Sequence, residues 1–325
     1  MSQPAETRLP KLVLAKDLSL LGASTKALSE ASRAGALTRI RQGIYVSTSE
    51  WRQLQPWQQY RLRVEAAAEA LSKPTVFSRH SAGAVWGIPT ILRGQPVHAI
   101  TTFRGGGRSR AGVKRHLVEG GRLDFVERDG LLVTGRVVTV LDLAAYVPFA
   151  EAIVPLDHVI KPDLMCHLPA LTKAQLLEAL EGRYPPTVER RVRAAIEFAD
   201  PLSASAGESY SRGLIHAAGL ARPVLQYRIP DVAGSAVFAD FYWEETRTVG
   251  EFDGIQKYQK PEYSNGRMPS QVVVDEKLRE DRIRATGRGV VRWVWADLNN
   301  PGELERKLRK AGVPGRRRAS AGPRT

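Results

Sequence analysis

Three acids and one lysine near residue 250 have the types and spacing of a metal site. The acids are Asp240, Glu251 and Asp253, and the lysine is Lys257. Glu251 and Asp253 are two residues apart, so in a β-strand their side chains point to the same face. Clustered carboxylates repel one another without a cation, and Mg²⁺ prefers hard oxygen ligands. We therefore predict that Asp240, Glu251 and Asp253 bind Mg²⁺ or Mn²⁺, with Lys257 supplying compensating charge.

The neighbouring sequence predicts a β-hairpin that brings these acids together. Two β-rich runs, residues 237–243 and 248–254, flank the polar turn 244–247. If Asp240 lies opposite Glu251 on the paired strand, three carboxylates converge. The alternative is an exposed hairpin that carries its acids on a solvated face.

Further elements surround the predicted hairpin on both sides. A helix is predicted from Gly207 to Gly219, with Glu208 in its first turn, and a strand over 223–227 contains Gln226. After the hairpin, residues 275–284 predict a charged helix, and residues 287–295 predict a buried strand.

This succession, from about residue 207 to residue 298, resembles the Vsr-like nucleases of the PD-(D/E)xK superfamily. The resemblance implies a restriction-endonuclease-like α/β/α core in which Glu208 supports the metal site from its helix. The usual Glu-x-Lys element of the superfamily is here Glu251-Phe252-Asp253-Gly254, which is similar to a Glu-x-Asp-Gly branch. Lys257 is expected to replace the missing lysine from a shifted position.

The chemistry implied by this resemblance is metal-assisted hydrolysis of a phosphodiester. Asp240 and Glu251 are expected to bind the metal ion, and Asp253 to bind a second ion or orient the water. Glu208 would act from the helix side, and Lys257 would stabilise negative charge on the phosphate.

The N-terminal segment has the outline of a winged helix. Residues 11–21 and 26–34 predict two short helices, and residues 37–46 predict a strand pair with a turn at Gly43. The Arg-x-x-x-Gly-x-Tyr pattern at Arg39, Gly43 and Tyr45 resembles the winged-helix domain of AbiEi-type antitoxins. This resemblance predicts DNA contacts, although winged helices also bind proteins. The predicted DNA-binding residues are Lys26, Arg33, Arg39 and Arg41.

The AbiEi-like resemblance continues to about residue 165 through two segments, 78–89 and 139–144. His80 and Asp142 lie in these segments but nothing in the sequence places them together. A lone histidine among small residues is more often a helix cap or a hydrogen-bonding core residue. We therefore leave both residues out of the predicted catalytic set.

Composition favours a phosphate-rich partner. The 325 residues include 48 Lys and Arg against 34 Asp and Glu, a formal net charge of +14, and eight of the basic residues lie in 306–325. The sequence has no apolar run approaching the ~18 to 20 residues of a membrane-spanning helix. A single cysteine, Cys166, excludes an intramolecular disulfide and a cysteine-based zinc cluster. We expect DNA as partner, no membrane, and a cytoplasmic location.

The predicted fold class is a multidomain α+β and α/β protein. The expected parts are a winged helix (1–55), an AbiEi-like mixed α/β middle domain (56–200), a PD-(D/E)xK nuclease domain (201–310) and a disordered basic tail (311–325). The leading functional hypothesis is an endonuclease in phage defence, a toxin-antitoxin system or DNA repair. One alternative is an antitoxin or transcriptional regulator with a non-catalytic nuclease fold. A third is an antitoxin that binds a cognate toxin through its middle domain.

Overall fold

The computed structural model describes residues 9–20, 24–102, 112–118, 124–230, 236–254 and 279–316. Helices and several sheets alternate along the chain, and the contacts divide it into unit 1, Met1–Leu143, and unit 2, Ala144–Thr325. The predicted mixture of helices and sheets is therefore confirmed. The finer division at residues 55, 200 and 310 stays a prediction. Among the helices described, none is long and apolar enough to cross a membrane.

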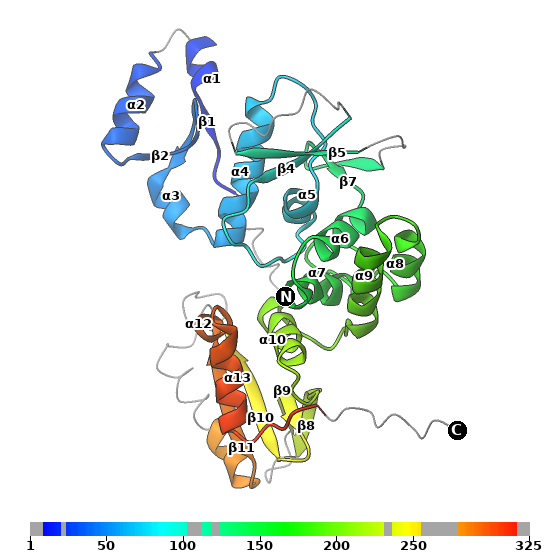
Figure 1. The fold of residues 1–325 in the computed structure, drawn as a ribbon. Helices are drawn as coiled ribbons and strands as arrows, with labels where there is room; N and C mark the ends of the chain where they lie inside the picture. Colours follow the sequence, from blue (N-terminus) through cyan, green and yellow to red (C-terminus); the bar gives the residue numbers. More distant parts are fainter. Residues whose placement is uncertain are drawn as a thin grey trace. The chain divides into compact units, whose positions relative to one another are not determined.

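Unit 1 begins with a three-stranded sheet of order β1-β3-β2 and two short helices (Figure 1). The elements are β1 (Val13–Leu14), α1 (Ala15–Leu20), α2 (Lys26–Arg33), β2 (Leu37–Arg41) and β3 (Ile44–Ser47). The second predicted helix and the strand pair are confirmed, with Gly43 at a φ of +71° in the turn. A helix over 11–21 was a wrong prediction, because Val13 pairs with Tyr45 of β3 and the helix starts only at Ala15.

The rest of unit 1 packs helices against two small two-stranded sheets. Its elements are α3 (Thr48–Gln53), α4 (Pro56–Ala70), α5 (Arg79–Trp86), β4 (Val97–Thr101), β5 (Val113–Leu117), β6 (Phe125–Arg128), β7 (Leu131–Thr134) and most of α6 (Arg136–Ala145), whose last two residues belong to unit 2. Strands β4 and β5 pair in parallel, whereas β6 and β7 pair antiparallel. The α4 side chains Leu62 and Val64 are fully buried, so this helix forms part of the core.

Unit 2 opens with four helices: α7 (Phe149–Val159), α8 (Lys173–Leu180), α9 (Pro186–Phe198) and α10 (Ala206–Ala217). Helices α7 and α10 pack very closely where Gly213 meets Ala150. A Cβ on Gly213 would lie 2.5 Å from the Ala150 Cα, so only glycine permits this approach. Arg212 and Asp157 join the same two helices through a buried ion pair of 3.3 Å.

A four-stranded sheet of order β11-β10-β9-β8 follows (Figure 1). Its elements are β8 (Val224–Pro230), β9 (Ala236–Trp243), β10 (Thr248–Asp253) and β11 (Gly289–Val294), followed by α12 (Trp295–Leu298) and α13 (Pro301–Lys310). Strand β10 is antiparallel to β9 and parallel to β11. The predicted hairpin, the helix before it and the strand after it are confirmed. The predicted charged helix is described from residue 279, and residues 279–285 are helical.

Helices cover both faces of this sheet. On one face Phe252 packs against α10, where a Cβ on Gly207 would lie 1.9 Å from the Phe252 ring. On the same face the buried Trp293 donates its indole N–H to Ser211 of α10 at 2.8 Å. On the other face Ile283 of the 279–285 helical segment is buried against Val249 and other sheet residues. Strand β10 therefore lies inside a packed layer, with its acids at one end.

Candidate functional site

Asp240 lies beside the backbone of β10, between the two acids of that strand. Phe241 of β9 pairs with Gly250 of β10, and the residue before Phe241, Asp240, contacts the next part of β10 through its side chain. Its Oδ2 accepts the backbone N–H of Phe252 at 3.0 Å. The Asp240 carboxylate is thus held next to the peptide that joins Glu251 to residue 252, with Asp253 one residue further on.

Two arginines bind the Glu251 carboxylate. Its Oε1 lies 3.0 Å from Nη2 of Arg279, and its Oε2 lies 2.9 Å from Nη2 of Arg292. Arg292 is the register partner of Glu251 on β11, and Arg279 begins the 279–285 helical segment. Glu251 is only 5% exposed. Because an unpaired buried carboxylate is costly, these guanidinium groups allow Glu251 to occupy the middle of the sheet.

The arginine pair belongs to a larger charged network. Arg292 Nε lies 3.2 Å from Glu280, and Arg284 Nη2 lies 2.8 Å from the same carboxylate. Arg279 also donates to the carbonyl oxygen of Phe238 at 2.6 Å. Neither Arg279 nor Arg292 was singled out in the sequence, where the compensating charge was assigned to Lys257. Lys257 itself lies outside the described residues.

Glu208 is fixed at the start of α10. Its carboxylate accepts the backbone N–H of Ala204 at 2.8 Å and the hydroxyl of Ser205 at 2.8 Å. Ser205 Oγ in turn accepts the backbone N–H of Glu208 at 3.2 Å, so the two residues cap the helix reciprocally. Glu208 therefore has a structural role at the helix start.

Gln226 links Glu208 to β8. Its Nε2 donates to Glu208 Oε2 at 3.3 Å, although Gln226 sits within a strand at a φ of +48°. A non-glycine residue in this region costs on the order of 1 kcal/mol or more, so the surrounding structure must hold it there. The pairing of β8 with β9 correspondingly skips the position of Gln226. The strand is therefore distorted where its side chain meets α10.

The donor chemistry of this site suits Mg²⁺, but its arrangement is not that of a ready-made metal site. Asp240 and Asp253 offer hard carboxylate oxygens, the ligand type that Mg²⁺ prefers. However, in the part of the chain that the structure describes, no three His, Cys, Asp or Glu side chains are grouped to hold a metal ion. Glu251 instead gives both carboxylate oxygens to arginines. The described residues therefore do not form a complete ligand set.

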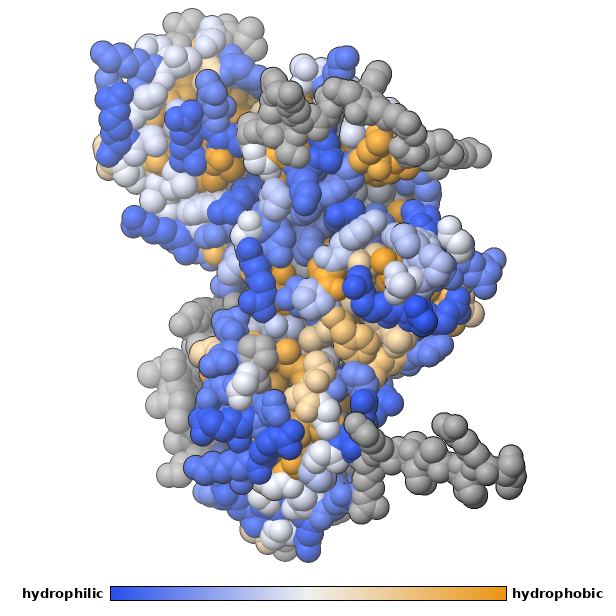
Figure 2. Space-filling model, in the orientation of Figure 1, coloured by the Kyte–Doolittle hydropathy of each residue, from blue (hydrophilic) through white to orange (hydrophobic). Residues whose placement is uncertain are grey.

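The four predicted DNA-binding residues lie on α2 and β2 of unit 1. Lys26 and Arg33 are exposed and share one side of α2, together with Glu30, which lies 3.7 Å from Lys26. In Figure 2 strongly hydrophilic residues line the outer edge of the region where Figure 1 places α2. On β2, Arg39 is exposed and Arg41 is half-buried. The cationic side chains are thus accessible on the helix and on the first strand of the hairpin.

Arg41 also lines a groove of about 760 Å³ within unit 1. Lys16 of α1 and Arg115 of β5 line the same groove, together with Glu69, whose carboxylate lies 2.6 Å from Lys16 Nζ. Lys16 and Arg115 were not singled out in the sequence. They are separated from Arg41 along the chain, and no local pattern indicates that folding brings them together.

His80 belongs to a stack of three histidines in unit 1. The ring centroids of His80 and His98 are 5.5 Å apart, and those of His98 and His116 are 5.1 Å apart. His98 Nδ1 and His116 Nε2 form a hydrogen bond of 2.8 Å. Burial, reinforced by neighbouring cationic charge, lowers the pKa of His80 to about 4, of His98 to about 3 and of His116 to about 4. These rings are therefore neutral packing groups near pH 7.

Comparison with known proteins found a likeness in structure but none in sequence. A scan against protein-family models and a search of curated proteins gave no match. A search of solved structures matched the crystal structure of the RV2827C protein from Mycobacterium tuberculosis, at 15% sequence identity and a TM-score of 0.37. The match covers 62% of this chain and 75% of that chain. At this level the likeness supports no conclusion about function.

Removing the Glu251 carboxylate should destabilise unit 2. The substitution Glu251→Ala leaves Arg279 and Arg292 without their shared partner, and we expect a loss of about 2 to 4 kcal/mol in the free energy of unfolding. Urea unfolding followed by circular dichroism measures this loss. Glu305→Ala removes an exposed partner of Arg309 and should change the value by less than about 1 kcal/mol. Equal stabilities of Glu251→Ala and wild type would contradict the described ion pairs.

The histidine stack should make unit 1 less stable as the pH falls. An unfolded histidine has a pKa of about 6.5, so below that pH the unfolded chain binds protons that the folded stack excludes. The stabilising contribution is complete above about pH 6.5 and is lost progressively towards pH 4. Thermal unfolding between pH 7.5 and pH 5 tests this.

Two variants isolate the stack in that measurement. His116→Gln keeps a hydrogen-bonding group beside His98 but removes one titrating ring, so its melting temperature should depend less on pH. His167→Asn alters an exposed histidine of unit 2 and should leave the dependence unchanged. The same pH dependence in His116→Gln and wild type would show that the stack does not titrate as described.

Proposed function

We propose that this protein binds DNA and that unit 2 is a metal-dependent endonuclease domain hydrolysing phosphodiester bonds. The observation that carries the proposal is the hydrogen bond from the Phe252 backbone to Asp240, which holds Asp240 beside the Glu251 and Asp253 strand. From α10 to β11 the order of elements is a helix, three antiparallel strands, a helical segment and a strand parallel to β10, which agrees with the Vsr-like resemblance in the sequence. The proposed metal-binding residues and the resemblance therefore lie in the same segment, from α10 to β11.

Each residue of the site has a distinct part in this proposal. Asp240 and Glu251 are the residues that would hold Mg²⁺, and Asp253 would bind a second ion or orient the water. A bound Mg²⁺ supplies a polarised phosphate and a water of lowered pKa. Glu208 positions the start of α10 against β8 through Gln226. Lys257 stabilises negative charge that develops on the phosphate.

Arg279 and Arg292 add a role that the sequence did not indicate. In the structure both pair with Glu251, and each guanidinium presents several donors in a fixed geometry that suits phosphate. When Glu251 turns to a metal ion, these two cations become available to a DNA phosphate at the same place. The arginines thus compensate Glu251 in one state and bind the nucleic-acid backbone in the other.

The proposed DNA-binding surface of unit 1 is α2 and the β2–β3 hairpin. Lys26 and Arg33 lie on one exposed side of α2, where a helix can enter the major groove. Arg39 and Arg41 of β2 are placed to contact phosphates, which fixes the position of the protein without reading sequence. The net charge of +14 supports association with DNA through counterion release.

A second function, an AbiEi-type antitoxin or regulator with a non-catalytic nuclease fold, is favoured by one specific observation. Both oxygens of Glu251 are bound by arginines, which is the arrangement expected of a structural ion pair. In that case unit 2 grips DNA or a cognate toxin and cuts nothing. DNA cleavage separates the two functions.

Purified protein should nick or cut DNA in the presence of Mg²⁺ or Mn²⁺. Asp240→Asn keeps an oxygen to accept the Phe252 N–H but removes the charge, and Glu251→Gln removes the charge of its own carboxylate. Each should lower the cleavage rate at least about 100-fold, the scale of losing one charge-stabilising group in an active site. Gel assays on double-stranded, single-stranded and RNA substrates measure the rate, with Glu245→Gln in the hairpin turn as control.

Two outcomes of the cleavage assay go against the endonuclease. Cutting that persists unchanged in both variants would place the activity elsewhere. Wild-type protein that binds DNA but leaves every substrate intact would favour the non-catalytic regulator. Folding of each variant is checked by circular dichroism, since Glu251 also contributes to stability.

The DNA affinity of unit 1 should depend on α2. The double substitution Lys26→Gln/Arg33→Gln should weaken binding and reduce the slope of log affinity against log salt by up to about 2, because it removes two positive charges that displace counterions from the DNA. Fluorescence anisotropy at several salt concentrations measures both quantities. Lys173→Gln/Arg183→Gln removes the same charge from unit 2 and serves as the matched control. Equal slopes in the two double variants would argue against α2 as the contact.

A further inference from the structure

A cavity in unit 2 lies away from the acids of β10. It has a volume of about 230 Å³ and lies between the end of α9, the end of α10 and the segment that leads into β8. Three arginines, Arg212, Arg222 and Arg316, line it together with His216 and the ring of Phe198. The remaining lining is aliphatic. A cationic cavity with one aromatic wall suits an anion joined to a small apolar body.

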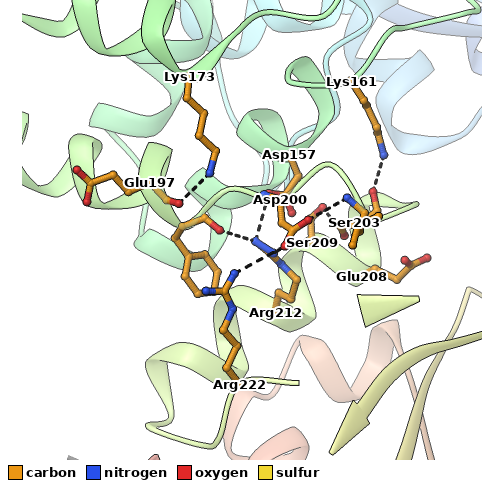
Figure 3. A network of polar contacts seen from close by, with 12 residues as sticks. Asp157, Lys161, Lys173, Glu197, Asp200, Ser203, Glu208, Ser209, Arg212 and Arg222 are labelled. Carbon is orange, nitrogen blue, oxygen red and sulfur yellow. Dashed lines mark hydrogen bonds and ion pairs between the residues drawn. The ribbon is translucent and has the colours of Figure 1, made fainter. Parts of the chain in front are cut away.

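Two of these guanidinium groups lie over the Phe198 ring. The Cζ atoms of Arg212 and Arg222 lie 4.6 Å and 5.3 Å from its centroid. Both arginines also approach Asp200, at 3.6 Å and 3.7 Å (Figure 3). The aromatic ring and the aspartate therefore hold the two cations side by side at the cavity.

Arg212 is a buried cation, and not all of its N–H donors are hydrogen-bonded. Its side chain is 3% exposed, and its Nη2 binds Asp157 at 3.3 Å and the Phe198 carbonyl oxygen at 3.1 Å (Figure 3). Among the described residues its Nε has no hydrogen-bond partner, and its Nη1 reaches only Asp200, at 3.6 Å. Since buried guanidinium donors without an acceptor are costly, an acceptor that entered the cavity would be bound favourably.

The C-terminal segment brings the third arginine to the cavity. Gly315 forms a β-bridge with Leu220, and the backbone N–H of Arg316 donates to the Gly219 carbonyl oxygen at 2.7 Å. A second backbone bond of 2.9 Å joins Ala221 to Pro314. These bonds fix Arg316 against α10. There it contacts His216, which lies about a hundred residues earlier in the sequence.

Positive charge exceeds negative charge at this cavity. Arg316 Nη1 contacts the imidazole Nδ1 of His216 at 3.2 Å, and in the described part of the chain it has no acidic partner. Burial, and then the three arginines, lower the pKa of His216, so this ring is neutral near pH 7. Three arginines thus face two carboxylates, those of Asp157 and Asp200. A bound anion would balance this surplus of one positive charge.

We propose that this cavity binds a terminal phosphate monoester. A phosphate offers three oxygens in a tetrahedral arrangement and can accept from guanidinium groups on several sides, whereas a carboxylate offers two in a plane. The cavity is smaller than the ~300 Å³ of common small-molecule sites, so it takes the phosphate and a small adjoining part of the ligand against Phe198. The phosphate belongs either to a free nucleotide or to the end of a nucleic-acid strand. The proposal is independent of DNA cleavage by the β10 site.

Calorimetry on the full-length protein with AMP and adenosine tests the proposal. AMP should bind, and adenosine, which lacks the phosphate, should not. Arg222→Gln and Arg316→Gln change side chains at the solvent edge of the cavity and should each weaken AMP at least about tenfold, the scale of one charged hydrogen bond. Arg309→Gln, an exposed residue of α13, is the control and should leave AMP affinity unchanged. The circular dichroism spectra of all variants should match that of wild type, which shows that the variants are folded.

The sources of the phosphate are separated with a short single strand carrying or lacking a 5′-phosphate. Tighter binding of the phosphorylated strand, lost in Arg316→Gln, supports the cavity as a reader of strand ends. Equal binding of both strands, with AMP still bound, supports a free nucleotide. Failure of AMP to bind at millimolar concentration, equal binding of AMP and adenosine, or unchanged AMP affinity in both arginine variants would overturn the proposal.

Discussion

The burial of one carboxylate, that of Glu251, is the constraint on which the four-stranded sheet of unit 2 depends. A charge at 5% exposure in the centre of a sheet is tolerated only when opposite charges accompany it. Arg292 reaches Glu251 because β10 and β11 are parallel and in register, and Arg279 reaches it because the preceding helical segment packs on the same sheet. The strand order and the placement of that segment are thus tied to a single side chain.

Close packing on the opposite face holds β10 in place. Gly207 leaves room for the Phe252 ring, and Gly250 leaves room for Trp243 and Trp293, where an added Cβ would approach the rings to 2.9 Å or less. The packed aromatic side chains therefore fix the position of β10 relative to α10. The acids that alternate with them along the strand are positioned by the same packing. Asp240 joins them through a backbone hydrogen bond, so its position is set by the same strand.

Local signals in the sequence predicted most elements of this fold, whereas contacts between distant residues were beyond them. The helix over 26–34 was predicted from local residues, and the structure has it as α2 (Lys26–Arg33). The hairpin that carries Asp240 and Glu251 was likewise predicted, because alternation and turn residues are adjacent in the chain. Arg279 and Arg292 were missed because charged residues are common, and only folding selects which of them meet Glu251. Val13 was misassigned to a helix because its pairing with Tyr45 is a tertiary interaction.

The central question is whether the carboxylates at the end of β10 bind a metal ion in place of the arginines or alongside them. Calorimetric titration of Mn²⁺ into the full-length protein tests this most directly, since it needs neither a substrate nor turnover. We predict saturable binding to wild type that is lost in Asp240→Asn and in Asp253→Asn and retained in the hairpin control Glu245→Gln. Absence of Mn²⁺ binding to wild type, or equal binding to all four proteins, would contradict the assignment of this site as a metal-dependent nuclease centre.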